Sequence, residues 1–244
     1  MGQICCSEIP QKIIKDSPPK IMNQAIDIYE KQISSCKEET FSSGVVYKGH
    51  LNKEKLRHGI GKLIWPNNSY YIGNFKNNVC CGHGVLVLNE DEFNEGEWEN
   101  DQLNGTGLIT MRNYTYCGDF LNGVPHGNGE IFYTEGGKYN GGFFNGMKQG
   151  EGTLTVINFN YKGHFDQDCM SGYGVCEWND GRKYEGYWEN NKMEGRGRFF
   201  WADGSLYEGE YEKGLKNGFG ILKGIDGQII CKGYWLKGKF FKNE

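Results

Sequence analysis

The chain has 244 residues, of which 38 are glycine and 9 are cysteine, and its formal net charge at pH 7 is −4. The acidic balance argues against a general binder of nucleic acids, because basic surface supplies most of their non-specific affinity. The sequence holds no apolar run of 18 or more residues and no secretory h-region, so we expect neither a transmembrane helix nor secretion. The odd number of cysteines, none in CxxC spacing, favours a reducing, intracellular setting.

An N-terminal arm, residues 1–46, begins with the sequence MGQICCS. Met-Gly followed by small residues is typical of N-myristoylation at Gly2, although the Ser or Thr usual at the sixth position is Cys6 here. One myristoyl chain binds membranes only marginally, and the five lysines of the arm are offset by six acidic residues. The second anchor would therefore be palmitate on Cys5 or Cys6. We expect lipidation within residues 1–7; the alternative is an ordinary chain start with two incidental thiols.

An amphipathic helix is expected next, over about residues 18–37. Ser17 is a candidate N-cap with Pro18 at the first helical position. Apolar residues then recur at spacings of 4, 3, 4 and 3, which places them on one helical stripe: Met22, Ile26, Tyr29, Ile33 and Cys36. The stripe either packs on the first hairpin of the following array and caps it, which we favour, or docks in a groove of a partner. Residues 40–44 would link the helix to the first strand.

The remainder, residues 47–244, is organised by the spacing of its glycines. Nine glycines recur at intervals of 22 to 24 residues: Gly49, Gly73, Gly96, Gly118, Gly141, Gly163, Gly186, Gly209 and Gly233. Most stand in the frame aromatic-x-Gly-x-aromatic, as in Tyr184-Glu185-Gly186-Tyr187-Trp188, and a second glycine pair follows eight times, as in Gly195 and Gly197. A fixed period of this length indicates a repeat array. Such arrays usually bind and space partners through a long surface.

Within each unit the spacing fits β-strands, whose side chains alternate between two faces. Tyr184, Gly186 and Trp188 share one face, where the ring of a neighbouring strand would cover the glycine. The other face carries mostly polar residues, such as Glu185 and Glu208, and is expected to face water. Asp-Gly and Asn-Asn pairs between units, such as Asp180-Gly181, predict hairpins.

These residues resemble the MORN repeat (membrane occupation and recognition nexus), roughly Y-x-G-x-W/F, then G-x-G, then D-G. The match covers eight units and a half from about Tyr47 to Trp235, with Asn94 and Cys231 in place of the leading tyrosine. The periodicity and the resemblance together predict an all-β fold: an elongated, twisted, single antiparallel sheet of stacked MORN hairpins, with an N-terminal helical arm. The tail of residues 237–242 would cap the sheet edge with its lysines.

The residue types that carry chemistry form no convincing site. The five histidines fall in different units, and Cys80-Cys81-Gly82-His83, the nearest approach to a ligand cluster, lacks a complementary pair. The G-x-G strings lack the strand–turn–helix context of nucleotide loops, and no pair of carboxylates stands out as acid and base. We therefore expect no catalytic residues, no metal and no cofactor. The residues of a partner-binding surface are not specified by the sequence.

The first functional hypothesis is a non-enzymatic scaffold, lipid-anchored at the N-terminus on the cytoplasmic side of a membrane. It would link the membrane to cytoskeletal or axonemal protein partners. The second is a soluble axonemal protein, like the radial-spoke-head proteins that the array resembles. A phospholipid head-group binder is disfavoured by the charge of −4. An enzyme is the weakest reading, because catalysis in MORN-containing enzymes lies in a separate domain and this chain ends in half a repeat. A homodimer is also considered, because the ring-bearing face would be only partly covered.

Overall fold

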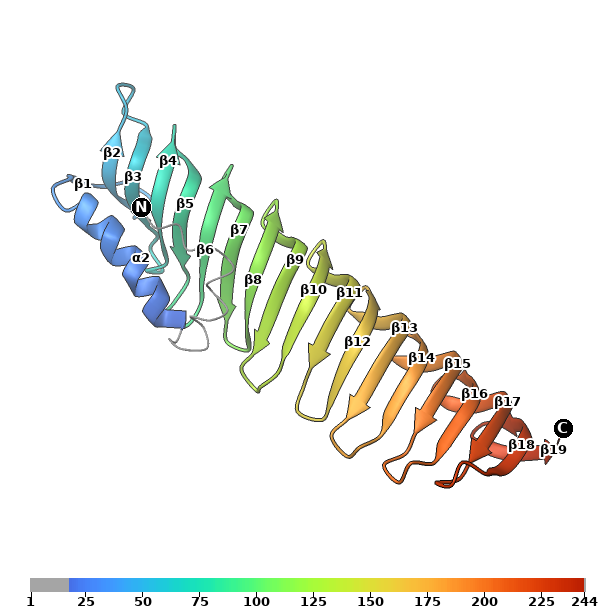
Figure 1. Cartoon of the computed structure of the whole chain (residues 1–244). Helices are drawn as coiled ribbons and strands as arrows, with labels where there is room; N and C mark the ends of the chain where they lie inside the picture. Colours follow the sequence, from blue (N-terminus) through green and yellow to red (C-terminus); the bar gives the residue numbers. More distant parts are fainter. Residues whose placement is uncertain (1–17, 244) are drawn as a thin grey trace. The chain divides into compact units, whose positions relative to one another are not determined.

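The computed structural model describes the backbone of residues 18–243 and the side chains of residues 23–243, which form one helix, α2 (Pro18–Gln32), and nineteen strands (Figure 1). The strands are β1 (Glu38–Thr40), β2 (Val46–Leu51), β3 (Arg57–Ile64), β4 (Tyr70–Lys76), β5 (Val79–Val87), β6 (Phe93–Glu99), β7 (Gln102–Met111), β8 (Tyr114–Leu121), β9 (Val124–Tyr133), β10 (Lys138–Phe144), β11 (Met147–Thr155), β12 (Phe159–Asp166), β13 (Cys169–Trp178), β14 (Lys183–Glu189), β15 (Lys192–Phe200), β16 (Leu206–Glu212), β17 (Leu215–Lys223), β18 (Ile229–Leu236) and β19 (Lys239–Asn243).

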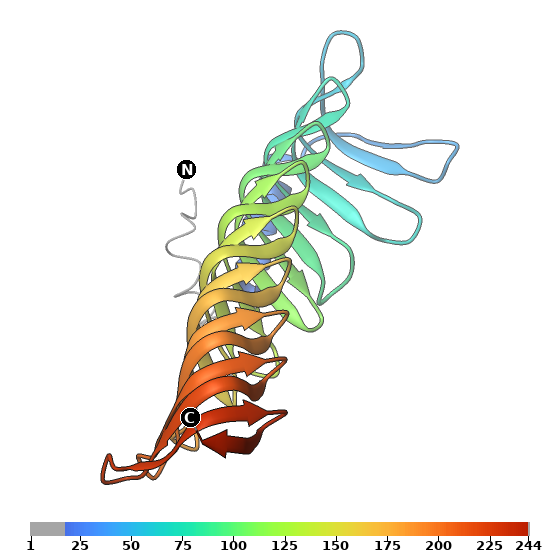
Figure 2. The same ribbon diagram turned by 90° about the vertical axis from the view of Figure 1, so that its right-hand side faces the viewer.

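The chain divides into two compact units, one ending at Glu135 and the other beginning at Gly136. Within each unit every strand pairs antiparallel with the next one along the chain, from β1 to β9 in the first unit and from β10 to β19 in the second. Successive hairpins therefore lie side by side, as Figure 2 shows for each unit. The predicted all-β fold of stacked antiparallel hairpins with an N-terminal helix is confirmed.

One face of the sheet, which we call the tyrosine face, carries a column of buried tyrosines. They are Tyr47, Tyr71 and Tyr116 in the first unit, and Tyr139, Tyr161, Tyr184 and Tyr207 in the second. The Tyr184 ring lies over Gly186 and Gly197, which face each other across β14 and β15, and a Cβ on Gly197 would lie 2.5 Å from the ring carbon Cε2. Glycine is therefore required there. Burying one ring contributes roughly 4–6 kcal/mol as an upper bound, more than the about 0.5–1 kcal/mol that each strand glycine costs.

Hydrogen bonds and ring contacts fix each tyrosine. The Tyr184 hydroxyl donates to the carbonyl oxygen of Tyr187 at 3.0 Å, and the other six tyrosines make the same bond three residues on. The Tyr184 ring meets Trp188 of its own hairpin and Tyr211 of the next edge to face, with centroids 5.1 Å and 5.3 Å apart. Such contacts tie each hairpin to its neighbour, so the sheet is stabilised repeat by repeat.

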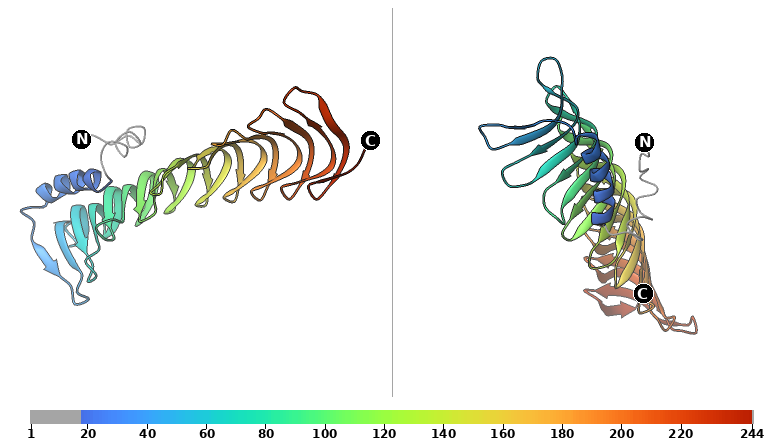
Figure 3. Two further views of the ribbon diagram at one scale, coloured as in Figure 1. Left: turned by 90° about the horizontal axis from the view of Figure 1, so that it is seen from below. Right: turned by 90° about the vertical axis from the view of Figure 1, so that its left-hand side faces the viewer.

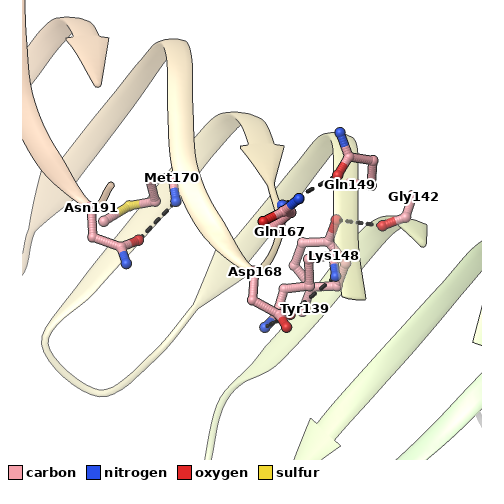
Figure 4. A network of polar contacts seen from close by, with 8 residues as sticks. All are labelled: Tyr139, Gly142, Lys148, Gln149, Gln167, Asp168, Met170 and Asn191. Atoms are coloured by element: carbon pink, nitrogen blue, oxygen red, sulfur yellow. Dashed lines mark hydrogen bonds and ion pairs between the residues drawn. The ribbon is translucent and has the colours of Figure 1, made fainter. Parts of the chain in front are cut away.

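The tight turns inside the hairpins were not among the predicted turns. Both turn residues have positive φ, as type I′ turns require, in eight two-residue turns that include Asn122-Gly123 and Asn190-Asn191. Figure 4 shows how one turn is bound to the preceding hairpin. Asp168 Oδ1 accepts hydrogen bonds from the Lys148 backbone N–H at 3.0 Å and from Lys148 Nζ at 2.9 Å, and its own N–H donates to Lys148 O at 3.1 Å. Asn191 Oδ1 accepts from Met170 N at 2.7 Å in the next repeat, so the tie recurs.

Three element boundaries differ from the sequence prediction. Helix α2 ends at Gln32 rather than near residue 37, and a turn follows in which the Cys36 N–H donates to Ile33 O at 3.0 Å. Residues 38–40, assigned to the arm, instead form β1 and pair with β2. The tail of residues 237–242 is more than a lysine cap, because Lys239–Asn243 form β19 against β18. The proposed cap Ser17 lies outside the described residues.

The helix contacts the first hairpin as predicted, through β3, but it also covers β4 and β5, and the predicted polarity of the opposite face is wrong for the first unit. Helix α2 lies along the opposite face of the first strands, not across the sheet end (Figure 3). Its residues Ile26, Tyr29 and Ile33 bury an apolar patch of that face: Ile72, Val85, Val87, Phe93, Leu108 and Cys117. The apolar residues occupy positions beside the glycines, such as Ile72 before Gly73, which the sequence reading took to be polar. Covering them requires the helix there.

Candidate partner-binding surface

On the opposite face of the second unit, the positions that are apolar in the first unit are largely polar. Across β14, β15 and β16 the residues Glu185, Arg198 and Glu208 stand next to one another in register. Arg198 pairs with Glu208, its Nη2 being 3.2 Å from Oε1. This row has no apolar patch on which the buried side of a helix such as α2 could pack. Its carboxylate and guanidinium groups remain in contact with water.

A second row on this face bears exposed aromatic residues. Tyr173 of β13 and Tyr187 of β14 are cross-strand partners, 56% and 52% exposed, and their rings meet edge to face at 5.7 Å. Phe219 of β17 and Tyr234 of β18 form a similar pair at 5.6 Å, with Tyr234 44% exposed. Exposed aromatic side chains with a polar tip are favoured in protein interfaces, because a large apolar area is desolvated without losing a hydrogen bond.

Between the two aromatic pairs lies a hollow of about 480 Å³. Tyr187 and Phe219 stand at its sides, and Arg196 and Glu210, cross-strand partners on β15 and β16, lie between them. Glu210 Oε2 accepts a hydrogen bond from the Phe219 N–H at 3.3 Å. The Arg196 side chain makes no hydrogen bond or ion pair with any residue that the structure describes, so its guanidinium is available to a partner's carboxylate.

The predicted lipidation residues Gly2, Cys5 and Cys6 lie outside the described residues. The cluster around His83 is structural: Cys80 is buried, and burial followed by a hydrogen bond to Asp101 raises the pKa of its thiol. His83 Nδ1 is 2.9 Å from the Tyr29 hydroxyl, and burial lowers the pKa of the imidazole. Within residues 23–243 no group of three or more His, Cys, Asp or Glu residues could hold a metal ion. No helix of the described part of the chain is long and apolar enough to cross a membrane.

The sequence analysis did not predict that Tyr173, Arg196 and Phe219 lie on one surface. The available signal is position: each stands between the two glycines of a pair, and this position holds Ile60, His83 and Thr106 in the first unit. Alternation places all of them on the opposite face. The sequence did not reveal where α2 packs, and therefore did not show which of these residues the helix covers.

Among the solved structures that are similar to this chain are two distant likenesses. A mutant of the TCP10 domain of Danio rerio CPAP is 13% identical with a TM-score of 0.41, covering 82% of this chain and 99% of that one. The SAS-4 (dCPAP) TCP domain of Drosophila melanogaster, in complex with a proline-rich motif of Ana2 (dSTIL), is 12% identical with a TM-score of 0.30, covering 80% and 87%. Neither likeness is close enough to support an argument about this chain. No curated protein sequence matches it.

A family model gives a direct assignment. The MORN repeat model matches eight times, at residues 47–70, 71–89, 95–115, 116–138, 139–155, 161–181, 184–206 and 207–229. Seven of the eight matched segments contain one of the buried core tyrosines, and together the matches cover more than half of the chain. The chain therefore belongs to the MORN repeat family.

Proposed function

We propose that the protein is a non-enzymatic scaffold, held at the cytoplasmic side of a membrane by acyl chains on Gly2 and on Cys5 or Cys6. It binds a cytoskeletal or axonemal protein partner through the opposite face of its second unit. A MORN array is a repeat scaffold and binding protein, which supports the general role. The anchor rests on the sequence MGQICCS and on the need for two acyl chains in stable anchoring.

The difference between the two units carries the proposed binding surface. In the first unit the chain's own helix α2 covers the opposite face, with Tyr29 donating to the His83 carbonyl oxygen at 3.0 Å and Glu30 Oε1 2.5 Å from Lys62 Nζ. In the second unit the same face exposes Tyr173, Tyr187 and Arg196. Helix α2 thus shows that the opposite face of a MORN hairpin has room for a polypeptide segment.

Photo-crosslinking tests the surface in the full chain expressed in ciliated eukaryotic cells. A benzoylphenylalanine at position 187 is expected to crosslink one discrete protein, and Tyr173→Ala with Phe219→Ala is expected to abolish that crosslink. The same probe at Ile157, which is 68% exposed in the loop between β11 and β12, is the matched control. An identical crosslinking pattern from both positions would contradict the proposal that this face binds the partner.

Metabolic labelling with alkyne-myristate and alkyne-palmitate tests the anchor. Gly2→Ala is expected to remove both labels, and Cys5→Ser with Cys6→Ser to remove palmitate only, because palmitoylation needs the membrane contact that myristate supplies. Both variants are expected to be lost from the membrane fraction and recovered in the supernatant. Absence of label on the unaltered chain would reject the anchor and leave a soluble axonemal spacer as the function.

A further inference from the structure

Two strands lie at open edges of the described sheets. In the first unit β1 pairs with β2, and its three residues are all exposed. In the second unit β19 pairs with β18, and its five residues are all exposed. Backbone N–H and C=O groups along such an edge are free to pair with a further strand, which makes each edge a template for association.

The two edges carry opposite charges. Strand β1 reads Glu38-Glu39-Thr40, and β19 reads Lys239-Phe240-Phe241-Lys242-Asn243. Glu38, Glu39 and Lys239 have no ion-pair or hydrogen-bond partner for their side chains among the described residues. The Lys242 ammonium lies 5.1 Å from the Tyr234 ring centroid, on the rim of the aromatic row. Lys48 lies opposite Glu38 across the β1–β2 pair, but neither edge's charged side chains form an ion pair with a described residue, so β1 offers two carboxylates and β19 two ammonium groups to a further strand.

We propose that copies of this chain associate head to tail, with β19 of one copy pairing with β1 of the next. The backbone hydrogen bonds of strand addition and the attraction between two lysines and two glutamates act together at this contact. Exposed apolar side chains adjoin both edges, Phe41 at 42% exposure after β1 and Phe241 at 68% within β19, and the contact removes part of that area from water.

The charge pattern also selects against the symmetric alternatives. Two β19 edges would bring four lysines together, and two β1 edges four glutamates, and like charges directly opposite one another destabilise a strand pair. Only the unlike edges attract. A contact between two different surfaces on identical chains leaves one free edge of each kind after an addition, so further copies can add to the first two. This inference does not depend on the proposed anchor or on the partner-binding surface.

Sedimentation velocity of the full chain purified from bacteria tests the proposal. At about 20 mM salt the weight-average mass is expected to rise with concentration above the 27.7 kDa monomer, and at about 1 M salt, where charges are screened within about 3 Å, to fall toward it. The double variant Lys239→Glu, Lys242→Glu and the double variant Glu38→Lys, Glu39→Lys are each expected to weaken association by about tenfold or more. The control Lys76→Glu, Lys192→Glu makes the same change in net charge as the Lys239→Glu, Lys242→Glu variant, at exposed sites away from both edges, and should associate as the unaltered chain does.

Mixing the two edge variants gives the decisive outcome. Each variant alone has two edges of like sign, but the lysine edge of one variant complements the glutamate edge of the other. Association is expected to return in the equimolar mixture at low salt. A monomeric unaltered chain at every concentration would overturn the proposal. So would variants that associate like the control, or a mixture that stays monomeric.

Discussion

At the scale of single residues, the pairing of one tyrosine with two glycines defines each repeat. The ring fills the space that two Cβ atoms would take, and the hydroxyl satisfies a carbonyl three residues on. The third repeat shows what happens without it. Asn94 replaces the tyrosine, its Oδ1 is buried with no hydrogen-bond partner among the described residues, and Leu103 lies 3.3 Å from where a Cβ on Gly96 would be. A leucine from the following strand thus occupies part of the space of the missing ring.

Gly174→Ala should destabilise the second unit. A Cβ there would lie 2.6 Å from the Tyr161 ring carbon Cε2, and the ring is fully buried and cannot move aside. Overpacking of this kind costs about 1–3 kcal/mol. The free energy of unfolding in urea measures it, with Thr153→Ala at an exposed strand position as the control. Equal stability of the two variants would show that the sheet relaxes around the added carbon.

Alkaline pH should unfold the chain through its buried phenols. Burial raises the pKa of Tyr29 and of Tyr47 to about 12, above the value of about 10 for an unfolded tyrosine. Since the folded state holds these protons more tightly, their stabilising effect is complete below pH 10 and is lost as pH rises from 10 through 12. Tyrosinate absorbance and far-ultraviolet circular dichroism should therefore change together in that range. Ionisation that precedes loss of strand signal would contradict the prediction.

At the scale of elements, helix α2 is a cover that part of the sheet requires. Ile33 is fully buried against that face, whereas Ile28 on the other side of the helix is 58% exposed. Ile33→Ala should cost about 2–4 kcal/mol by leaving a cavity, and Ile28→Ala less than about 0.5 kcal/mol. Amide hydrogen exchange should report the difference as faster exchange in α2, β4 and β5 for the first variant. Equal protection in both variants would mean that the helix is not held by this contact.

Much of this organisation could be predicted from the sequence. The glycine period gave the strands, their alternation and the tyrosine face, because these depend on local spacing alone. The short turns were also within reach, since Asn122-Gly123 and Asn145-Gly146 are strong hairpin signals. The place of α2 and the end of that helix at Gln32 could not be predicted, because they depend on contacts between residues as distant in sequence as Tyr29 and His83. The exposed aromatic row of the second unit could not be predicted either, because its exposure depends on which part of the opposite face α2 covers.

At the scale of the whole molecule, the second unit has a buried tyrosine in each of its four repeats. In the second unit ring contacts link Tyr139 to Phe165, Tyr161 to Trp188, Tyr184 to Tyr211 and Tyr207 to Trp235. Residues 136–244 alone should therefore fold, with strand-like circular dichroism, a cooperative urea transition and buried fluorescence from Trp188 and Trp235, which are 6% and 8% exposed. A tryptophan emission typical of full solvent exposure would show that the second unit needs the first as a template.

The uneven distribution of the tyrosines has a consequence for covalent chemistry on the folded chain. Of 15 tyrosines, the seven of the core are buried with bonded hydroxyls, and the described tyrosines with more than a third of their surface exposed are Tyr173, Tyr187 and Tyr234. Reagents or kinases that need an accessible phenol would act on one face of the second unit. Mild iodination followed by peptide mass mapping thus becomes a footprint of that face, and loss of label in cells would register an occupant before its identity is known.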